Sequence, residues 1–284
     1  VITGNENVTC PGYYQYKSFK YGCHDHAPPT DIPTALMHSC NSYFFSMIQR
    51  LIEKEGFYNP EPGLETLNKY LYEFGLGNKL GIDLVHEIDG FVPTPDFYKY
   101  LYRSEGGTWY STYIMSIGIG QGELELTTLQ MANLAAIIAN KGYYYTPHIA
   151  RGFSDPKLKL EEKFTVKKKV SINPKHFEPV IEGMYKTISR GTGYKAYVPG
   201  LDICGKTGTS QNNQAGGKDH SVFYAFAPKD DPKIAIAVYV ENAGFGGDIA
   251  APIASLAIEK YLNGEASRKR LEKSILNIEL IDKP

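Results

Sequence analysis

The sequence predicts an α+β fold in two subdomains. Helical segments come first, an antiparallel sheet comes last, and one more helix follows it. Two observations support this prediction. Apolar residues recur at helical spacing in the first half of the chain, and apolar runs of strand length replace them after residue 200. Helices, then strands, then a helix that lies across the sheet is an α+β layout.

The first half contains three predicted helices. Irregular loops extend to about Pro33, which suits the first turn of a helix, and apolar residues then recur at helical spacing until Gly56. A second helix is predicted over 64–74, where a glycine-rich turn ends it. A third helix, over 127–140, begins with capping threonines and stops before a glycine.

Three further segments differ in character. Residues 81–103 contain prolines and many aromatic residues, so an ordered extended segment is expected there. Residues 151–176 are rich in Lys with alternating charge, which suits an exposed hairpin or loop. A helix is predicted to follow over 179–189.

The last third of the chain has the period of β-strands. Alternating or continuous apolar runs over 202–209, 221–227 and 234–240 predict three adjacent antiparallel strands. The segment PKDDP, residues 228–232, makes a tight connection between the last two strands. A terminal helix is predicted over 251–262.

Composition excludes several classes of protein. The 284 residues are 42% hydrophobic and 21% charged, which excludes a disordered or collagen-like chain. The 30 Lys and Arg residues balance 31 Asp and Glu residues, so no nucleic-acid partner is expected. No apolar run is long enough to span a membrane, and the chain begins with Val. We therefore expect a segment excised from a longer protein, with any anchor or signal upstream.

The whole chain, 1–284, is interpreted as one truncated domain. Residues 1–150 form a mostly helical part with an N-terminal loop rich in Cys and His, and residues 151–284 form a sheet part with a terminal helix.

A Lys-Thr-Gly-Thr segment on the first predicted strand is the sharpest local signal for a binding site. Lys206, Thr207 and Thr209 offer a cation and two hydroxyls, which suit a carboxylate. Gly208 lets another backbone approach closely, and the amide of Thr209 suits a developing oxyanion. Cys204 is interpreted as a small buried residue rather than as a ligand.

A second candidate element lies in the first predicted helix. Ser39 and Asn41, within SCNSYFFSM, could line a cleft from one face of that helix. The alternative is that both are ordinary polar residues whose side chains bond to the helix backbone, because Ser-x-Asn recurs twice elsewhere in the chain.

Several long segments together resemble the class B penicillin-binding proteins, specifically the D,D-transpeptidase domain of the penicillin-binding protein 2 type. The resemblance covers nearly the whole chain. It implies the fold shared by penicillin-binding proteins and serine β-lactamases, an antiparallel sheet packed with helices plus a mostly helical subdomain. Its segments are SCNSYFF (39–45), FGLGNKLGIDL (74–84), PTPDF (93–97), SIGIGQGELELTTLQMANLAAIIANKG (116–142), GTG (191–193) and CGKTGTSQ (204–211).

The chain departs from the family's pattern at one motif. The nucleophile motif S-x-x-K should precede Ser39 and does not occur there. The S-x-x-K at 154–157 follows Ser39, lies in a charged segment and contains a proline that does not suit a helical turn, so it is rejected. We therefore expect the nucleophile upstream and this fragment, taken alone, to be inactive.

The resemblance also implies a reaction for the intact protein. A serine attacks a peptidoglycan stem peptide, D-Ala leaves, and an amine of a second stem peptide resolves the acyl-enzyme into a cross-link. The implied partners are stem peptides, β-lactam antibiotics and the cell-wall elongation machinery. The implied location is the periplasm, in a protein anchored in the bacterial inner membrane. No cofactor is required for acyl transfer.

The resemblance assigns roles to the candidate residues. Ser39 relays protons with the lysine of the upstream S-x-x-K motif, Asn41 holds the substrate amide, and Lys206 is the third catalytic residue. The strand residues bind the terminal carboxylate of the substrate, and the amide of Thr209 forms half of the oxyanion hole; the substrate-binding set is Thr207, Gly208 and Thr209.

Three alternatives remain open. A D,D-carboxypeptidase or a β-lactamase would use the same fold, although the long matches favour a transpeptidase. A non-catalytic β-lactam sensor or scaffold module would bind a cell-wall partner instead. Turnover of a stem-peptide donor with an amine acceptor separates these possibilities.

The cysteines near the N-terminus predict either a metal site or a disulfide. Cys10, Cys23, His26 and Cys40 offer three thiolates and one imidazole, a full tetrahedral set for structural zinc. His24 is the competing imidazole. The alternative is a Cys10–Cys23 disulfide, which an oxidising compartment favours. Several relatives are similar in this arrangement of Cys and His, which supports zinc.

Overall fold

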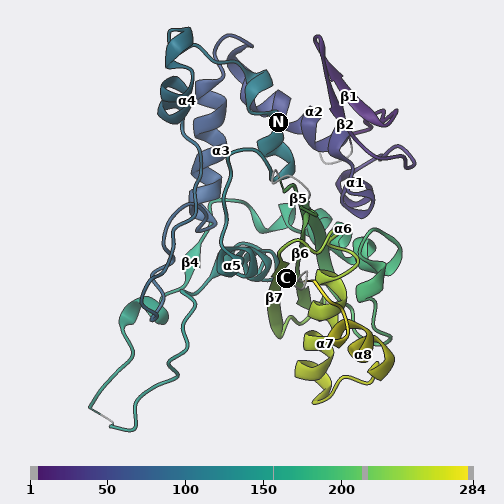
Figure 1. Ribbon diagram of the computed structural model, residues 1–284. Helices are drawn as coiled ribbons and strands as arrows, with labels where there is room; N and C mark the ends of the chain where they lie inside the picture. The colour runs from purple at the N-terminus through teal and green to yellow at the C-terminus, as the bar shows by residue number, and fades with distance from the viewer. Residues whose placement is uncertain (1–5, 156, 213–216, 281–284) are drawn as a thin grey trace.

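A three-stranded antiparallel sheet lies at the centre of the molecule (Figure 1). The structure is a computed structural model that describes residues 6–155, 157–212 and 217–280. The strands are β5 (Cys204–Ser210), β6 (His220–Ala227) and β7 (Ile234–Val240), in the order β5-β6-β7. The predicted α+β fold is confirmed, and the three strands lie within two residues of their expected bounds.

Helices cover both faces of the sheet. Side chains along β6 alternate between the two faces, and the apolar ones on each face pack against helices. Phe223 and Ala225 point toward α7 (Ala250–Asn263), whose first two turns are rich in alanine. Phe226 points the other way, into a core that includes residues of α5 (Thr128–Ala139) and α6 (Glu178–Arg190). The alanines of α7 thus pack against Phe223 and Ala225, whereas Phe226 packs against larger side chains of α5 and α6.

The helical part packs around a separate apolar core above the sheet in Figure 1. Its helices are α2 (Asn41–Ile52), α3 (Glu61–Glu73) and α4 (Pro95–Leu101). Gly63 lies where α3 crosses α2: a Cβ there would come 2.4 Å from the Ile52 Cα, so only glycine permits this crossing.

A β-hairpin that the sequence analysis did not predict lies beside α2 (Figure 1). Its strands are β1 (Tyr13–Tyr16) and β2 (Phe19–Gly22), in a region expected to be irregular loop. Tyr14 and Tyr21 place their rings against Phe45 of α2. A four-residue strand shows too little periodicity to be recognised in the sequence, and packing against α2 stabilises it.

The predicted helix over residues 33–56 is wrong in one respect that matters for the site. It is two helices, α1 (Ile32–His38) and α2, separated by a turn. Ser39 has the left-handed conformation at φ 53° and ψ 44°, and the Cys40 thiol accepts a hydrogen bond from the Tyr43 amide to begin α2. Nothing in the apolar spacing revealed this break, because the apolar residues keep helical spacing across it.

Two other expectations differ from the structure. Residues 81–103, expected to be extended, contain α4, which Thr94 caps and Pro95 begins. A short terminal helix, α8 (Lys269–Leu276), was not expected and lies against α7, to which the ion pair of Arg268 with Glu259 at 3.0 Å attaches it. The prediction that 151–176 is an exposed hairpin or loop agrees with a long arm that projects from the body (Figure 1).

The arm is closed at its root by two short strands, β3 (Tyr143–Tyr144) and β4 (Lys168–Lys169), which pair antiparallel. Short 3-10 helices complete the fold at Glu53–Glu55, Arg103–Glu105, Ser111–Tyr113, Met115–Ile119, Glu162–Phe164, Pro174–His176 and Tyr194–Ala196. Within the described ranges, no helix combines the length and apolar character that crossing a membrane requires.

The proposed division at residue 150 stays a prediction, and packing crosses it. α5 precedes residue 150 but packs on β6 and β7, where Ile137 and Ile138 share a core with Phe226. α1 likewise packs on α6. The division at residue 150 therefore does not coincide with a boundary between apolar cores.

Candidate active site and metal cluster

The turn that carries Ser39 is held against α6. The Asp31 carboxylate accepts the Thr34 amide at 2.8 Å and begins α1, and the Thr187 hydroxyl of α6 donates to the Leu36 carbonyl at 3.1 Å. Gly183 of α6 leaves room for this packing, since a Cβ there would lie 2.7 Å from the Leu36 side chain. The C-terminal end of α1, and with it Ser39, is thus fixed beside the sheet.

Ser39 and Lys206 meet across the two parts of the molecule. The Lys206 ammonium donates to the Ser39 hydroxyl oxygen at 2.8 Å and to the Thr207 carbonyl at 2.8 Å. Burial lowers the pKa of Lys206 to about 8, because the ammonium loses water and no carboxylate ion-pairs with it in the described ranges. The pair is therefore able to pass a proton near neutral pH, with the amine accepting what the hydroxyl releases.

The two threonines of the strand motif do not converge with Lys206. Alternation along β5 puts Thr207 and Thr209 on the face opposite Lys206. The Thr207 hydroxyl lies 2.9 Å from the hydroxyl of Thr192, and the Gly246 amide donates to the Thr209 hydroxyl at 3.5 Å. The expectation that all three side chains bind one carboxylate stays a prediction; here the two threonine hydroxyls contact Thr192 and Gly246 rather than Lys206.

The edge of β5 is open to a ligand backbone. In the described part of the chain, β5 pairs only with β6, so no strand covers its other edge. The close backbone approach expected at Gly208 is present: a Cβ on Gly246 would lie 2.2 Å from the Gly208 carbonyl oxygen. Gln121 crosses from the helical part and donates its amide to the Thr209 carbonyl at 3.1 Å.

Two residues that organise this site were not singled out from the sequence. Thr192 donates its amide to the Met37 carbonyl at 3.3 Å while its hydroxyl meets Thr207, so it joins the Ser39 turn to β5. Gln121 connects the helical part to the same strand. Both stand between glycines, in GTG at 191–193 and GQG at 120–122, and that context was the available signal.

Asn41 lies apart from the Ser39–Lys206 contact. It is the first residue of α2, and its side-chain amide donates to the Gly22 carbonyl of β2 at 3.1 Å. In this arrangement the residue holds the β1–β2 hairpin to the start of α2. Its expected role toward the substrate amide stays a prediction.

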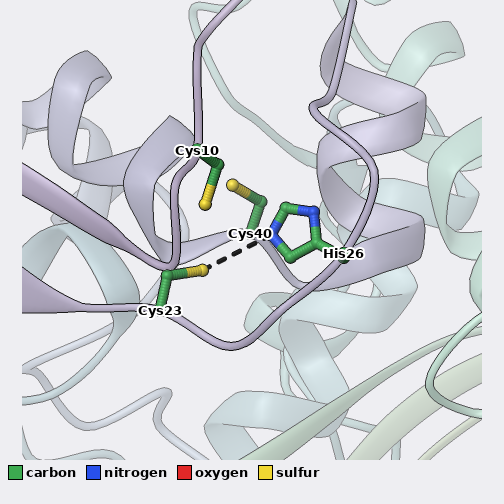
Figure 2. Close-up of side chains that lie close together, drawn as sticks. All are labelled: Cys10, Cys23, His26 and Cys40. Carbon is green, nitrogen blue, oxygen red and sulfur yellow. Dashed lines mark hydrogen bonds between the residues drawn. The ribbon is translucent and has the colours of Figure 1, made fainter.

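The four predicted metal ligands come together directly behind the Ser39 turn. Figure 2 shows the side chains of Cys10, Cys23 and Cys40 gathered beside the ring of His26, with the Cys23 sulfur directed at that ring. All four ligand atoms lie within 4.8 Å of one another, and the Cys23 sulfur is 3.4 Å from His26 Nε2. Cys10 and Cys40 are buried, whereas the other two are partly exposed.

These donors fit a tetrahedral metal. Tetrahedral zinc with bonds of about 2.3 Å to sulfur needs sulfur atoms roughly 3.8 Å apart, which agrees with the span of this cluster. The alternative Cys10–Cys23 disulfide is not formed here, where both are free thiols. His24 is not one of the four clustered residues, and its ring is tilted by 55° against that of His26, with 4.9 Å between the centroids.

The close thiols shift one another's pKa values through hydrogen bonds. A hydrogen bond from Cys40 lowers the pKa of Cys23 to about 3, and the same bond raises the pKa of Cys40 well above its usual value. Close thiols thus favour one thiolate shared among them. A divalent cation is the group that stabilises all of them as thiolates. Cys204 is fully buried beside β6 and outside this cluster, as predicted.

Comparison with known proteins identifies the family. Residues 1–259 match the family model described as the penicillin binding protein transpeptidase domain. The peptidoglycan D,D-transpeptidase MrdA of Haemophilus influenzae is 30% identical over 288 residues, which cover 93% of this chain and 42% of that protein. The chain thus spans about two fifths of the length of this curated relative.

Solved structures agree in fold. The crystal structure of Pseudomonas aeruginosa PBP2 in complex with WCK 5153 superposes with a TM-score of 0.74 at 27% identity, covering 94% of this chain and 57% of that one. PBP2 of Helicobacter pylori, solved in complex with MreC, superposes with a TM-score of 0.73 at 24% identity, covering 93% of this chain and 46% of that one. With Lys206 of the Lys-Thr-Gly segment in contact with Ser39, these matches show that the chain belongs to the penicillin-binding protein transpeptidase domain family, with class B enzymes of the PBP2 type among its relatives.

Proposed function

We propose that this chain is part of an enzyme that cross-links peptidoglycan stem peptides by acyl transfer through a serine. The observation that carries the proposal is the contact between Lys206 and Ser39 at 2.8 Å beside the open edge of β5. An open strand edge binds an extended peptide by main-chain hydrogen bonds, and the hydroxyl–amine pair next to it moves protons. The name of the H. influenzae relative, a peptidoglycan D,D-transpeptidase, supports the same reaction.

The reaction has two balanced steps. A serine oxygen attacks the carbonyl carbon of the penultimate D-Ala, the C–N bond breaks, and the proton from the serine leaves with the amine of D-Ala. The amine of a second stem peptide then attacks the ester, the C–O bond breaks, and the serine regains a proton. Ser39 and Lys206 carry these protons between the nucleophile and the leaving or attacking amine.

The nucleophile in this proposal comes from outside the 284 residues. No S-x-x-K motif precedes Ser39 in the sequence, and the family's serine belongs to that motif. This chain supplies the proton relay, the strand edge and the cation that meets the terminal carboxylate. By itself, the chain is expected to be inactive.

We also propose that Cys10, Cys23, His26 and Cys40 bind a structural zinc ion. Four protein ligands leave no open coordination position, so zinc bound there supplies folding energy rather than a reacting water. Cys40 follows Ser39 directly, so the metal holds the turn whose hydroxyl faces Lys206. The site acts on catalysis through the position of that hydroxyl.

The location and partners proposed for the longer protein follow from its relatives. Stem peptides are assembled into the wall outside the inner membrane, which supports a periplasmic location for this domain, and β-lactams would acylate the same serine as the substrate. The H. pylori relative was solved in complex with MreC, which supports a partner in the cell-wall elongation machinery.

The test is covalent labelling of the longer protein by a fluorescent penicillin, followed by turnover of a stem-peptide donor with an amine or with water. Lys206→Met is expected to slow acylation by about 100-fold or more, because the relay amine and its charge are lost. Lys54→Met is the matched control, since Lys54 is exposed on the helical part. Release of D-Ala to water alone would identify a carboxypeptidase, and labelling of the 284-residue chain at any serine would contradict an upstream nucleophile.

A further inference from the structure

An open hollow of about 480 Å³ lies at the root of the projecting arm, outside the site described above. It is formed by residues 140–143, where α5 leads into β3, and by residues 167–174, where β4 leads toward α6. Its volume is within the range of small-molecule and peptide pockets. None of the residues that line it contributes to the Ser39–Lys206 contact or to the metal cluster.

The lining of the hollow is basic and contains no carboxylate. Lys141, Lys167 and Lys169 line it. Lys141 is paired with Glu178 at 2.7 Å, but within the described ranges no carboxylate lies within ion-pair distance of Lys167 or Lys169. The surrounding segment, 151–175, has eight basic residues and three acidic ones in a chain whose formal net charge is −1. This local excess of positive charge attracts an anionic ligand.

The spacing of Lys167 and Lys169 suits an anionic ligand that carries more than one charged group. Lys167 and Lys169 are exposed on one side of the β4 segment, while Lys168 points the other way, toward the Leu80 carbonyl at 3.5 Å. The Cα atoms of residues two apart on a strand are separated by about 6.6 Å, so each of these lysines is able to meet a different carboxylate of one extended peptide. They match carboxylates that are themselves spaced along an extended peptide.

The remaining walls suit a peptide backbone and its aliphatic groups. The Lys167 ammonium lies 3.9 Å from the centre of the Tyr143 ring, which orders that lysine beside the hollow. Val170, Ile172 and Pro174 supply an apolar wall. A ligand with both carboxylates and short aliphatic side chains fits both surfaces.

We propose that this hollow binds the carboxylates of an uncross-linked peptidoglycan stem peptide, as a second site separate from the acyl-transfer site. The proposal rests on the proposed function for the identity of the peptide. The two sites lie at opposite ends of α6: Pro174 precedes that helix, and Gly191, where the helix ends, leads to Thr192 beside β5. A 13-residue helix is about 20 Å long, so one stem peptide held at Lys206 leaves the hollow free for another.

The experiment measures binding of a stem tripeptide, which ends before the two D-Ala residues and is therefore not a donor. Isothermal titration or NMR is carried out on the 284-residue chain. The double variant Lys167→Gln/Lys169→Gln is expected to weaken binding about tenfold, and higher salt is expected to weaken binding to the parent. The matched control Lys54→Gln/Lys260→Gln removes two exposed charges elsewhere and is expected to bind as the parent does.

Three outcomes would overturn the proposal: no binding of the tripeptide to the parent, equal binding by the double variant and the parent, or equal binding of a tripeptide whose carboxylates are amidated. If Ac-Glu-Ala-Glu-NH2 binds through the two lysines while the tripeptide does not, the pocket takes an acidic protein segment and the stem-peptide assignment is wrong. Penicillin labelling of the longer protein is measured separately, so failure of the acyl-transfer proposal is distinguishable from failure of this one.

Discussion

The two sides of the Ser39–Cys40 peptide bond have opposite surroundings. Ser39 directs its hydroxyl to Lys206 at the open edge of the sheet, whereas the Cys40 thiol is fully buried in the cluster with Cys10 and Cys23. On the first side, a cation loses water without gaining a carboxylate partner, which costs stability. On the second side, buried thiols become a source of stability once a metal binds. The comparison teaches that one turn joins a costly reactive group to the cluster that we propose holds the turn in place through a bound metal.

The largest expected effect comes from disrupting the cluster of Cys10, Cys23, His26 and Cys40. Removal of metal with a chelator, or Cys40→Ala, is expected to lower the free energy of unfolding by several kcal/mol, because structural zinc contributes about 10–16 kcal/mol of binding energy in small zinc domains. Thermal unfolding with and without chelator, together with native mass spectrometry, measures this. Cys204→Ala is the matched control, as a buried cysteine outside the cluster.

Zinc at this site is supported if the chelator lowers the unfolding temperature of Cys204→Ala as much as that of the parent. The chelator should then have no effect on Cys40→Ala. Native mass equal to that of the bare chain, with two thiols missing from a thiol count, would show a disulfide instead.

An effect of intermediate size is expected from Lys206, whose burial makes the stability of the folded chain depend on pH. The pKa of Lys206 in the folded chain, about 8, lies below its value of about 10.5 in the unfolded chain. The unfolded state therefore binds more protons between these two values, and stability rises with pH there. The stability lost by burying the charged Lys206 is at its full value below about pH 8 and is absent above about pH 10.5.

Lys206→Met removes this cost and is expected to raise the free energy of unfolding by about 1–3 kcal/mol at pH 7, while it abolishes proton relay. Urea unfolding at pH 7 and pH 10 checks the sign. A stability gain for Lys206→Met that does not shrink as the pH rises would contradict desolvation as its source.

The smallest effect tests the turn itself. Ser39 has a positive φ of 53°, a conformation that glycine adopts more readily than alanine. Ser39→Gly is expected to be more stable than Ser39→Ala by about 1 kcal/mol, although both lack the hydroxyl and both should slow acylation in the longer protein. Ala136→Gly, in the interior of α5, is the control and should change stability in the opposite direction. Equal stability of the two Ser39 variants would mean that the turn relaxes.

The elements that could be predicted from the sequence are those with a long, regular period. The strand bounds at β7 and the helix bounds at α5 differ from the expected ones by at most one residue, because Ile234–Val240 is continuously apolar and Thr127 is a clear cap. The pattern failed where tertiary contacts stabilise short elements. β1 and β2 exist because their tyrosines pack on α2, and α4 exists because Thr94 caps a single short helix.

The candidate site divides in the same way. Residue types and spacing predicted the Lys-Thr-Gly strand and the four ligands Cys10, Cys23, His26 and Cys40, and the structure brings the four ligand atoms together. The sequence could not show that Thr192 joins Thr207 to the Met37 carbonyl, because that link depends on three segments that meet only in the folded chain.

The sequence by itself determined the α+β class, the order of the elements and the chemical groups of both candidate sites, because these depend on local periodicity and on residue type. Only the tertiary structure decided the break at Ser39, the separation of Lys206 from the threonines, and the basic hollow beside β4. Those features arise where segments distant in sequence pack together. Their positions are set by the shapes of the buried cores, which no local pattern records.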